Sequence, residues 1–134
     1  MLQRTRDFTL PEIIHRVNDF PAELTPIGLI AMGYVQGMRD ALWDRYKKEI
    51  GIRISSGYRS AKYNASLKNA SPTSYHVWRW SPTGQAIWAL DLVPVGLDLI
   101  KFEQFCKDYV RGETYRHATY NIIHIAPFGP DEEW

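Results

Sequence analysis

The chain has 134 residues, 45% of them hydrophobic, which suits one domain with a single hydrophobic core. Its net charge is only +1, and this balance argues against the clustered basic surface that nucleic-acid binding requires. A lone cysteine, Cys106, excludes an intrachain disulfide framework, and its apolar helical surroundings favour a buried, inert thiol. We predict a single domain over residues 1–134.

No targeting or membrane segment is evident. Residues 1–7 are polar and charged, and no apolar run follows them, so the sequence predicts no signal peptide. The most apolar segment, residues 27–35, is about half as long as a membrane-spanning helix. We therefore expect synthesis in the cytoplasm without membrane insertion. A substrate beyond the membrane would require release of the protein or delivery by another particle.

Two helices are predicted at the start of the chain. Thr9-Leu10-Pro11-Glu12 is typical of a helix N-terminus, with proline in the first turn. Thr25-Pro26 begins a longer helix, which we expect to end at Gly51. Apolar residues recur along it at intervals of three or four and should face the core: Ile27, Ile30, Tyr34, Met38, Leu42 and Tyr46.

Strands dominate the remainder. Residues 52–55 alternate as a strand, and residues 62–69 suit one or two helical turns. Residues 75–80 and 85–93 are expected to form a hairpin around residues 81–84, where Gly84 can adopt the left-handed conformation. Asp98 can cap a helix over residues 99–110, residues 112–116 are expected as a polar loop, and residues 120–126 form the last strand. The predicted class is α+β, with N-terminal helices packed on a small, mainly antiparallel sheet that carries a metal site.

Two of these strands carry polar residues in apolar surroundings. Asp91 and His124 are each flanked by aliphatic residues, and a buried carboxylate is costly unless a cation or several donors compensate. Pairing across the hairpin places His76 near Asp91, and a further strand would bring His124 within reach. Catalytic zinc takes three such ligands and leaves one position open. Ordinary alternatives remain: hydrogen-bonded core histidines, or Asp91 paired with Arg59 in a domain without metal.

Five short segments occur in an order that resembles the D-alanyl-D-alanine carboxypeptidase family of zinc metallopeptidases. That family includes vancomycin-resistance dipeptidases and phage endolysins that cut the L-Ala-D-Glu bond, and it shares its fold with the hedgehog signalling domain. The resemblance covers about residues 52–127. The segments are Ser56-Gly57-Tyr58-Arg59-Ser60, Tyr63-Asn64, Ser74-Tyr75-His76, Ala89-Leu90-Asp91 and Ile123-His124-Ile125.

The resemblance implies that His76, Asp91 and His124 bind Zn2+. It also implies that Arg59 holds the substrate or polarises its carbonyl, and that Ser74 contacts the substrate. A salt bridge for Arg59 and a loop-capping hydroxyl for Ser74 are the structural alternatives. Tyr58 is a further candidate substrate contact, although a packing role suits it better. The implied substrates are peptidoglycan stem peptides, cut as a D-Ala-D-Ala carboxypeptidase or an L-Ala-D-Glu endopeptidase would cut them.

The sequence departs from the family pattern in two places. Residues 77–90 make an unusually long interval between the first two ligands, so we interpret residues 77–84 as an insertion that extends the hairpin as a ribbon. The acidic residue that serves many members as general base is also missing, because Asn121 and Ala126 occupy the two positions where it is expected. Replacement proton carriers are His117, which is alternatively a surface residue, Glu113, or an acid within residues 131–133.

Two functions are therefore weighed. The first is a zinc peptidase of the cell wall, for example a phage lysis or tail-associated enzyme. The second, which Asn121 favours, is a catalytically silent member whose metal is structural and which binds cell wall or a protein such as a phage virion component.

Overall fold

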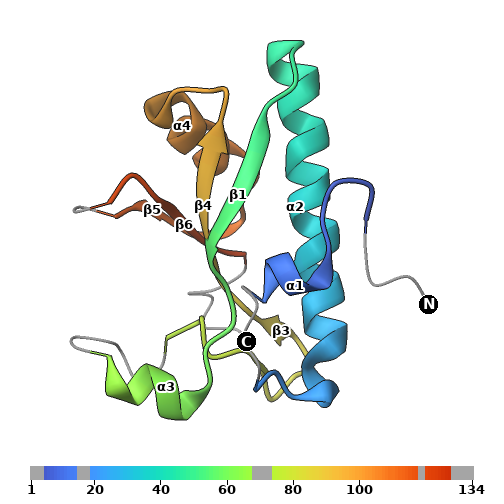
Figure 1. Ribbon diagram of the computed structural model, residues 1–134, viewed down its shortest axis with the longest axis vertical. Coiled ribbons are helices and arrows are strands. Elements are labelled where there is room, and N and C mark those ends of the chain that lie inside the picture. Colours follow the sequence, from blue (N-terminus) through green and yellow to red (C-terminus); the bar gives the residue numbers. More distant parts are fainter. Residues whose placement is uncertain (1–4, 15–18, 68–73, 118–119, 128–134) are drawn as a thin grey trace.

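A four-stranded antiparallel sheet forms the centre of the computed structural model, which describes residues 5–14, 19–67, 74–117 and 120–127 (Figure 1). The strand order is β1-β4-β6-β5, so that β4 and β6, which are distant in sequence, lie side by side in the middle. The strands are β1 (Gly51–Ser56), β4 (Leu90–Val95), β5 (Gly112–Arg116) and β6 (Ile123–Pro127).

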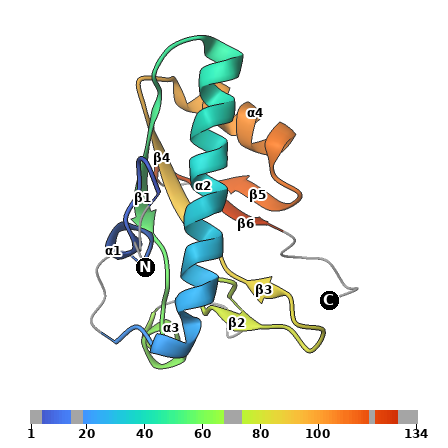
Figure 2. The same ribbon diagram turned by 90° about the vertical axis from the view of Figure 1, so that its right-hand side faces the viewer.

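Two helices, α2 (Thr25–Tyr46) and α4 (Leu99–Tyr109), pack on one face of this sheet (Figure 2). Alternate strand residues point to opposite faces, so β1, β4 and β6 each direct alternate apolar side chains into the core beneath these helices. Burying this apolar surface is the main force that holds the layers together. The sheet contributes to the core Ile52, Ile54, Leu90, Leu92, Ile123 and Ile125. The α+β class predicted from the sequence is confirmed.

The long helix α2 begins at Thr25 as predicted but ends at Tyr46, before Gly51. Lys47 takes the left-handed conformation (φ 54°) and its N–H donates to Trp43 O, which closes the helix. The predicted inward stripe is partly wrong, because Ile30 is 46% exposed. The neighbouring small residue Ala31 is buried instead.

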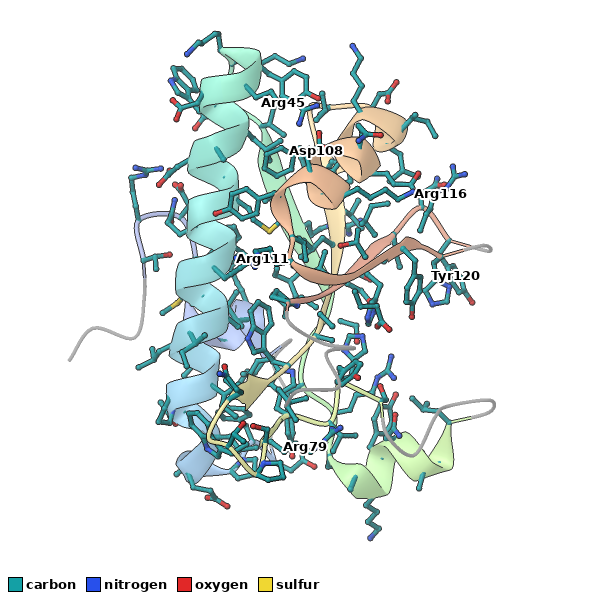
Figure 3. The ribbon with its side chains drawn as sticks, turned by 180° about the vertical axis from the view of Figure 1, so that it is seen from behind. Arg45, Arg79, Asp108, Arg111, Arg116 and Tyr120 are labelled. Atoms are coloured by element: carbon teal, nitrogen blue, oxygen red, sulfur yellow. The ribbon has the colours of Figure 1, made fainter. Side chains whose placement is uncertain are left out.

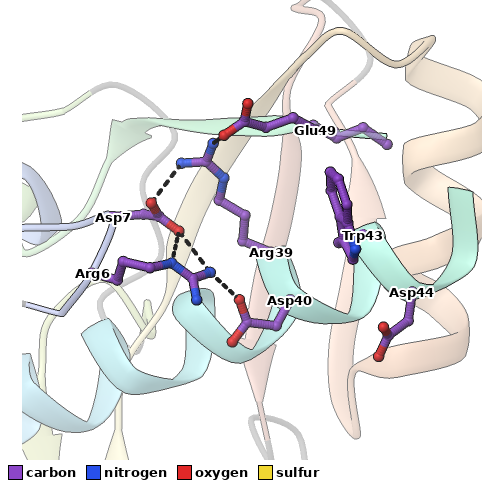
Figure 4. A pocket seen from close by; sticks show the side chains of 8 residues that line it. Arg6, Asp7, Arg39, Asp40, Trp43, Asp44 and Glu49 are labelled. Carbon is purple, nitrogen blue, oxygen red and sulfur yellow. Dashed lines mark hydrogen bonds and ion pairs between the residues drawn. The ribbon is translucent and has the colours of Figure 1, made fainter. Parts of the chain in front are cut away.

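The N-terminal segment is tied to α2 by charged side chains. Helix α1 (Leu10–Ile13) begins as predicted, with the Thr9 N–H donating to Glu12 Oε1 at 3.1 Å. Residues 15–18, where its apolar stripe was expected to continue, lie outside the described residues. Figure 4 shows the adjoining pocket, whose volume is about 410 Å³; among the described residues that line it, each arginine is paired with acids. The ion pairs are Arg6 with Asp7 and Asp40, and Arg39 with Asp7 and Glu49.

The predicted hairpin is shorter than expected. Only β2 (Arg79–Trp80) and β3 (Ala86–Ile87) pair, around a turn in which Gly84 has φ +84° as predicted. The inserted segment is not simply a protruding ribbon, because Trp78 is buried and its indole N–H donates to Ala89 O at 3.3 Å. Its ring packs edge-on against Tyr58 and Phe20, which anchors the chain just before the ribbon starts.

Helix α4 begins where predicted, with Asp98 Oδ1 accepting the Lys101 N–H at 2.9 Å. An ion pair between Arg45 and Asp108 links its end to α2 (Figure 3). Cys106, a residue of α4, is buried as expected, and burial raises the pKa of its thiol. The segment expected as a polar loop after this helix is instead strand β5, at the edge of the sheet. None of the helices within the described ranges is long and apolar enough to span a bilayer.

Candidate metal centre

Asp91 and His124 lie side by side on the face of the sheet that is opposite α2 and α4, the open face. Asp91 is in β4 between Leu90 and Leu92, whose side chains enter the core, so its carboxylate points the other way. In β6, His124 is the direct cross-strand partner of Asp91. Such partners share a face, and here His124 Nδ1 lies 3.0 Å from Asp91 Oδ1.

His76 reaches the same carboxylate from outside regular structure. It lies in a turn, and not in the strand that the sequence predicts. Its carbonyl accepts the Arg59 N–H at 2.7 Å, and its ring Nδ1 lies 2.7 Å from Gly57 O. These contacts direct Nε2 toward Asp91 Oδ1, at 3.2 Å. The β1 strand, which leads into Gly57, has a register shift opposite this point, between Ile54 and Ser56.

One potential ligand atom from each of the three residues lies within 4.8 Å of the others, and all three side chains are buried. Two imidazole nitrogens and a carboxylate oxygen are the ligand set of many catalytic zinc sites. Burial raises the pKa of the Asp91 carboxyl, but the adjoining His124 and His76 imidazoles together outweigh it and hold that pKa below its usual range.

The hydrogen-bond partners on the far side of each ring test whether a metal fits. Gly57 O can only accept, so His76 Nδ1 carries a hydrogen, and a neutral ring then directs the Nε2 lone pair at Asp91. A carboxylate oxygen, Glu113 Oε1, lies 2.7 Å from His124 Nε2 and in the same way leaves the lone pair on Nδ1. Three electron-rich atoms therefore converge, and a cation bound among them would stabilise this arrangement. The donor set fits a divalent metal ion.

A comparison with protein-family models gives an independent result. The model described as Peptidase M15 matches residues 6–126, which is most of the chain. The chain belongs to the Peptidase M15 family. Peptidases of this family are zinc-dependent, and the cluster of His76, Asp91 and His124 is a set of residues that could hold such an ion. No curated protein and no solved structure matches the chain.

The other predicted site residues of this M15 chain are placed as follows. The guanidinium of Arg59 bonds to Asn64 Oδ1 at 3.4 Å, and not to Asp91 as the metal-free alternative required. Ser74 Oγ accepts the His76 N–H at 3.2 Å, so it caps the turn that holds this proposed ligand. Tyr58 is buried and its ring contacts Trp78, so it has the packing role that was predicted as the alternative to a substrate contact.

Of the predicted candidates for proton transfer, Glu113 contacts His124, whereas His117 and Asn121 do not lie at the cluster. His117 is exposed, and its ring neighbours are Tyr115 and Tyr120, beyond the end of β5. Asn121 is also exposed, whereas Ala126 is buried. The acids of residues 131–133 lie outside the described residues.

Tyr115 was not predicted as a site residue, because its segment was expected to be a loop. The tyrosine ring stacks on the His124 ring, with centroids 4.4 Å apart and an interplanar angle of 15°. Burial, followed by the charges of Glu113 and Asp91, raises the pKa of the Tyr115 hydroxyl, while Arg59 lowers it. The phenol ring thus lies directly against the proposed ligand His124.

Proposed function

We propose that this M15 chain is a zinc-dependent peptidase that hydrolyses peptide bonds in peptidoglycan stem peptides. The observation that carries the proposal is the convergence of His76 Nε2, Asp91 Oδ1 and His124 Nδ1 on one point of the open sheet face. Three protein ligands leave a position for water or substrate, as in catalytic zinc sites. When bound, zinc supplies a Lewis acid that polarises the scissile carbonyl and activates a water.

The chain's own groups would hold and orient the substrate. Arg59 follows directly from Tyr58 in the core, and its backbone N–H is fixed by His76 O. Its guanidinium has five donors, and its bond to Asn64 uses only part of them. A planar donor fork suits the terminal carboxylate of a stem peptide or the oxyanion that develops during hydrolysis. We assign Arg59 this binding role.

The proposed hydrolysis also needs a group that transfers a proton. Asn121 cannot exchange a proton at neutral pH, and a positioned acid or base commonly contributes about a hundredfold to ten-thousandfold in rate. We propose His117 as the candidate to test first, because histidine is the commonest general acid or base in enzymes and His117 lies in the segment that joins β5 to β6, the strand of His124.

Metal analysis of the purified protein tests the proposal. We expect about one zinc ion per chain in the wild type and none in His76→Ala, because a catalytic site is built from three ligands. His117→Ala is the matched control, since it removes an exposed histidine outside the cluster and should retain zinc. Equal zinc in the wild type and His76→Ala would refute the site.

Activity is measured by incubating the zinc-loaded protein with muropeptides and analysing the products by mass spectrometry. Loss of a terminal D-alanine identifies a carboxypeptidase, and separation of L-Ala from D-Glu identifies an endopeptidase. Arg59→Ala should reduce turnover without loss of zinc. A phage lysis or tail-associated enzyme is the biological setting that we propose for either activity.

A second function is favoured by Asn121, which stands where many relatives carry the acidic base. In this alternative the zinc site is structural and the protein binds cell wall or a phage virion protein. Bound zinc without cleavage, and no gain of activity in Asn121→Asp or Asn121→Glu, would support it over the peptidase.

A further inference from the structure

The edge strand β5 places two side chains directly on His124. Tyr115 is the cross-strand partner of His124, and Glu113 is the partner of Ala126. Cross-strand partners share a face, and positions two apart in a strand do so as well, so Glu113, Tyr115 and His124 all project from the open face. One short edge strand thus surrounds this histidine on two sides.

The contact with Glu113 determines which ring nitrogen faces the cluster. Glu113 Oε1 lies 2.7 Å from His124 Nε2, while Nδ1 faces Asp91. The Glu113 side chain is only 32% exposed, which strengthens a charge-assisted hydrogen bond relative to one in open water. A carboxylate on Nε2 keeps the hydrogen there and leaves Nδ1 with its lone pair.

This position also separates Glu113 from the role of general base. The nitrogen that it contacts is the one directed away from the cluster, so the imidazole ring stands between the carboxylate and the point where the ligand atoms converge. A general base must come within hydrogen-bond reach of the proton that it removes. A carboxylate on the outer nitrogen instead orients the ring and raises the basicity of the inner nitrogen.

Tyr115 restrains the same ring in a different way. The two rings are nearly parallel, at 15°, with centroids 4.4 Å apart. Rotation of the imidazole out of this plane would break the stacking, and a half-turn that restores the plane would still lose the hydrogen bond to Glu113. The ring is therefore held in the one orientation that presents Nδ1 to Asp91.

We propose that Glu113 is a positioning residue that selects Nδ1 of His124 as the metal-binding atom, with Tyr115 fixing the plane of the ring. This inference rests on the metal site of the proposed function. It assigns to the edge strand a contribution to metal affinity, because outer carboxylates of this kind commonly change affinity by about 10- to 100-fold.

The test compares zinc dissociation constants, measured by competition with a chromophoric chelator, for the wild type and three variants. Glu113→Ala should bind zinc about 10- to 100-fold more weakly. Glu113→Gln should recover most of the affinity, because its amide oxygen still accepts from Nε2. Glu49→Ala is the control, since it removes a glutamate whose ion pair is with Arg39, and it should leave the affinity unchanged.

A second measurement needs no variant. In the zinc-loaded wild type, long-range ¹H–¹⁵N spectra should show His124 protonated at Nε2 and bound through Nδ1, and the reverse assignment would overturn the inference even if Glu113→Ala does not fold. Unchanged affinity in Glu113→Ala would also overturn it while leaving the zinc site intact. Absence of zinc from the wild type would instead refute the proposed function.

Discussion

Gly57 is the residue at which fold and site depend most closely on each other. A Cβ added there would lie 2.0 Å from the carbonyl oxygen of Ile13 and 3.2 Å from its carbonyl carbon. Both atoms belong to the backbone at the end of α1, so no side-chain rotation relieves the overlap. The carbonyl of Gly57 also accepts from His76 Nδ1, so any displacement of this strand end reaches the proposed metal ligand.

Gly57→Ala should therefore destabilise the protein strongly. Overpacking commonly costs about 1–3 kcal/mol, and a clash with backbone belongs at the upper end of that range. Unfolding entropy of about 2.1 cal/mol/K per residue, applied to the chain, converts 3 kcal/mol into a fall in Tm of about 11 °C. The variant should also bind zinc more weakly, because His76 loses its fixed acceptor.

Gly33→Ala is the matched control for this change. Gly33 lies within α2, and a Cβ there would meet no atom within 4 Å. The same substitution should stabilise this helix by about 0.5–1 kcal/mol, or raise Tm by about 2–4 °C. Thermal melts followed by circular dichroism, in excess chelator and then with added zinc, measure both variants. Equal Tm values for wild type and Gly57→Ala would refute the close approach of α1 to this turn.

Three further substitutions test other parts of the fold by the same thermal melts. Asp98→Ala removes the cap of α4 and should cost about 1 kcal/mol, and an unchanged Tm would show that the cap contributes nothing. Trp78→Phe removes the donor to Ala89 O and should cost about 1–3 kcal/mol, whereas a neutral result would mean that this carbonyl finds another donor. The hydrogen bond from Gln36, followed by ion pairing, lowers the pKa of Asp7, so its stabilisation is present above the ordinary pKa of 3.8 and is lost as pH falls through the lowered value. Asp7→Asn should then lower Tm at pH 7 and lose this effect in strong acid, and a deficit that does not change with pH would contradict the reasoning.

Elements with strong local signals were predicted well from the sequence. The proline-containing starts of α1 and α2, and the Asp98 cap of α4, depend on neighbouring residues only. The alternation in β1 was equally informative. The polar residues in apolar strands led to Asp91 and His124, which the structure brings together with His76.

The errors came from interactions that are distant in sequence. His76 lies in a turn because its backbone bonds to Arg59 rather than to a strand. Strand β5 was expected as a loop because its residues are polar, and polar residues suit an edge strand whose open face adjoins a charged cluster. The spacing of apolar residues by three or four also suggested that Ile30 faces inward, whereas the helix buries the smaller Ala31 beside it.

The placement of one proposed ligand outside the sheet has a kinetic consequence. Asp91 and His124 are held by ladders of backbone hydrogen bonds, whereas His76 belongs to a turn fixed by a few contacts. Segments with few such bonds open locally at lower free energy than the sheet does. Dissociation of a bound ion should therefore begin with opening of this turn, and the rate of opening should limit the rate of dissociation. Amide hydrogen exchange at Arg59, whose N–H is donated to His76, would slow on zinc loading, while the amides between β4 and β6 keep their rates.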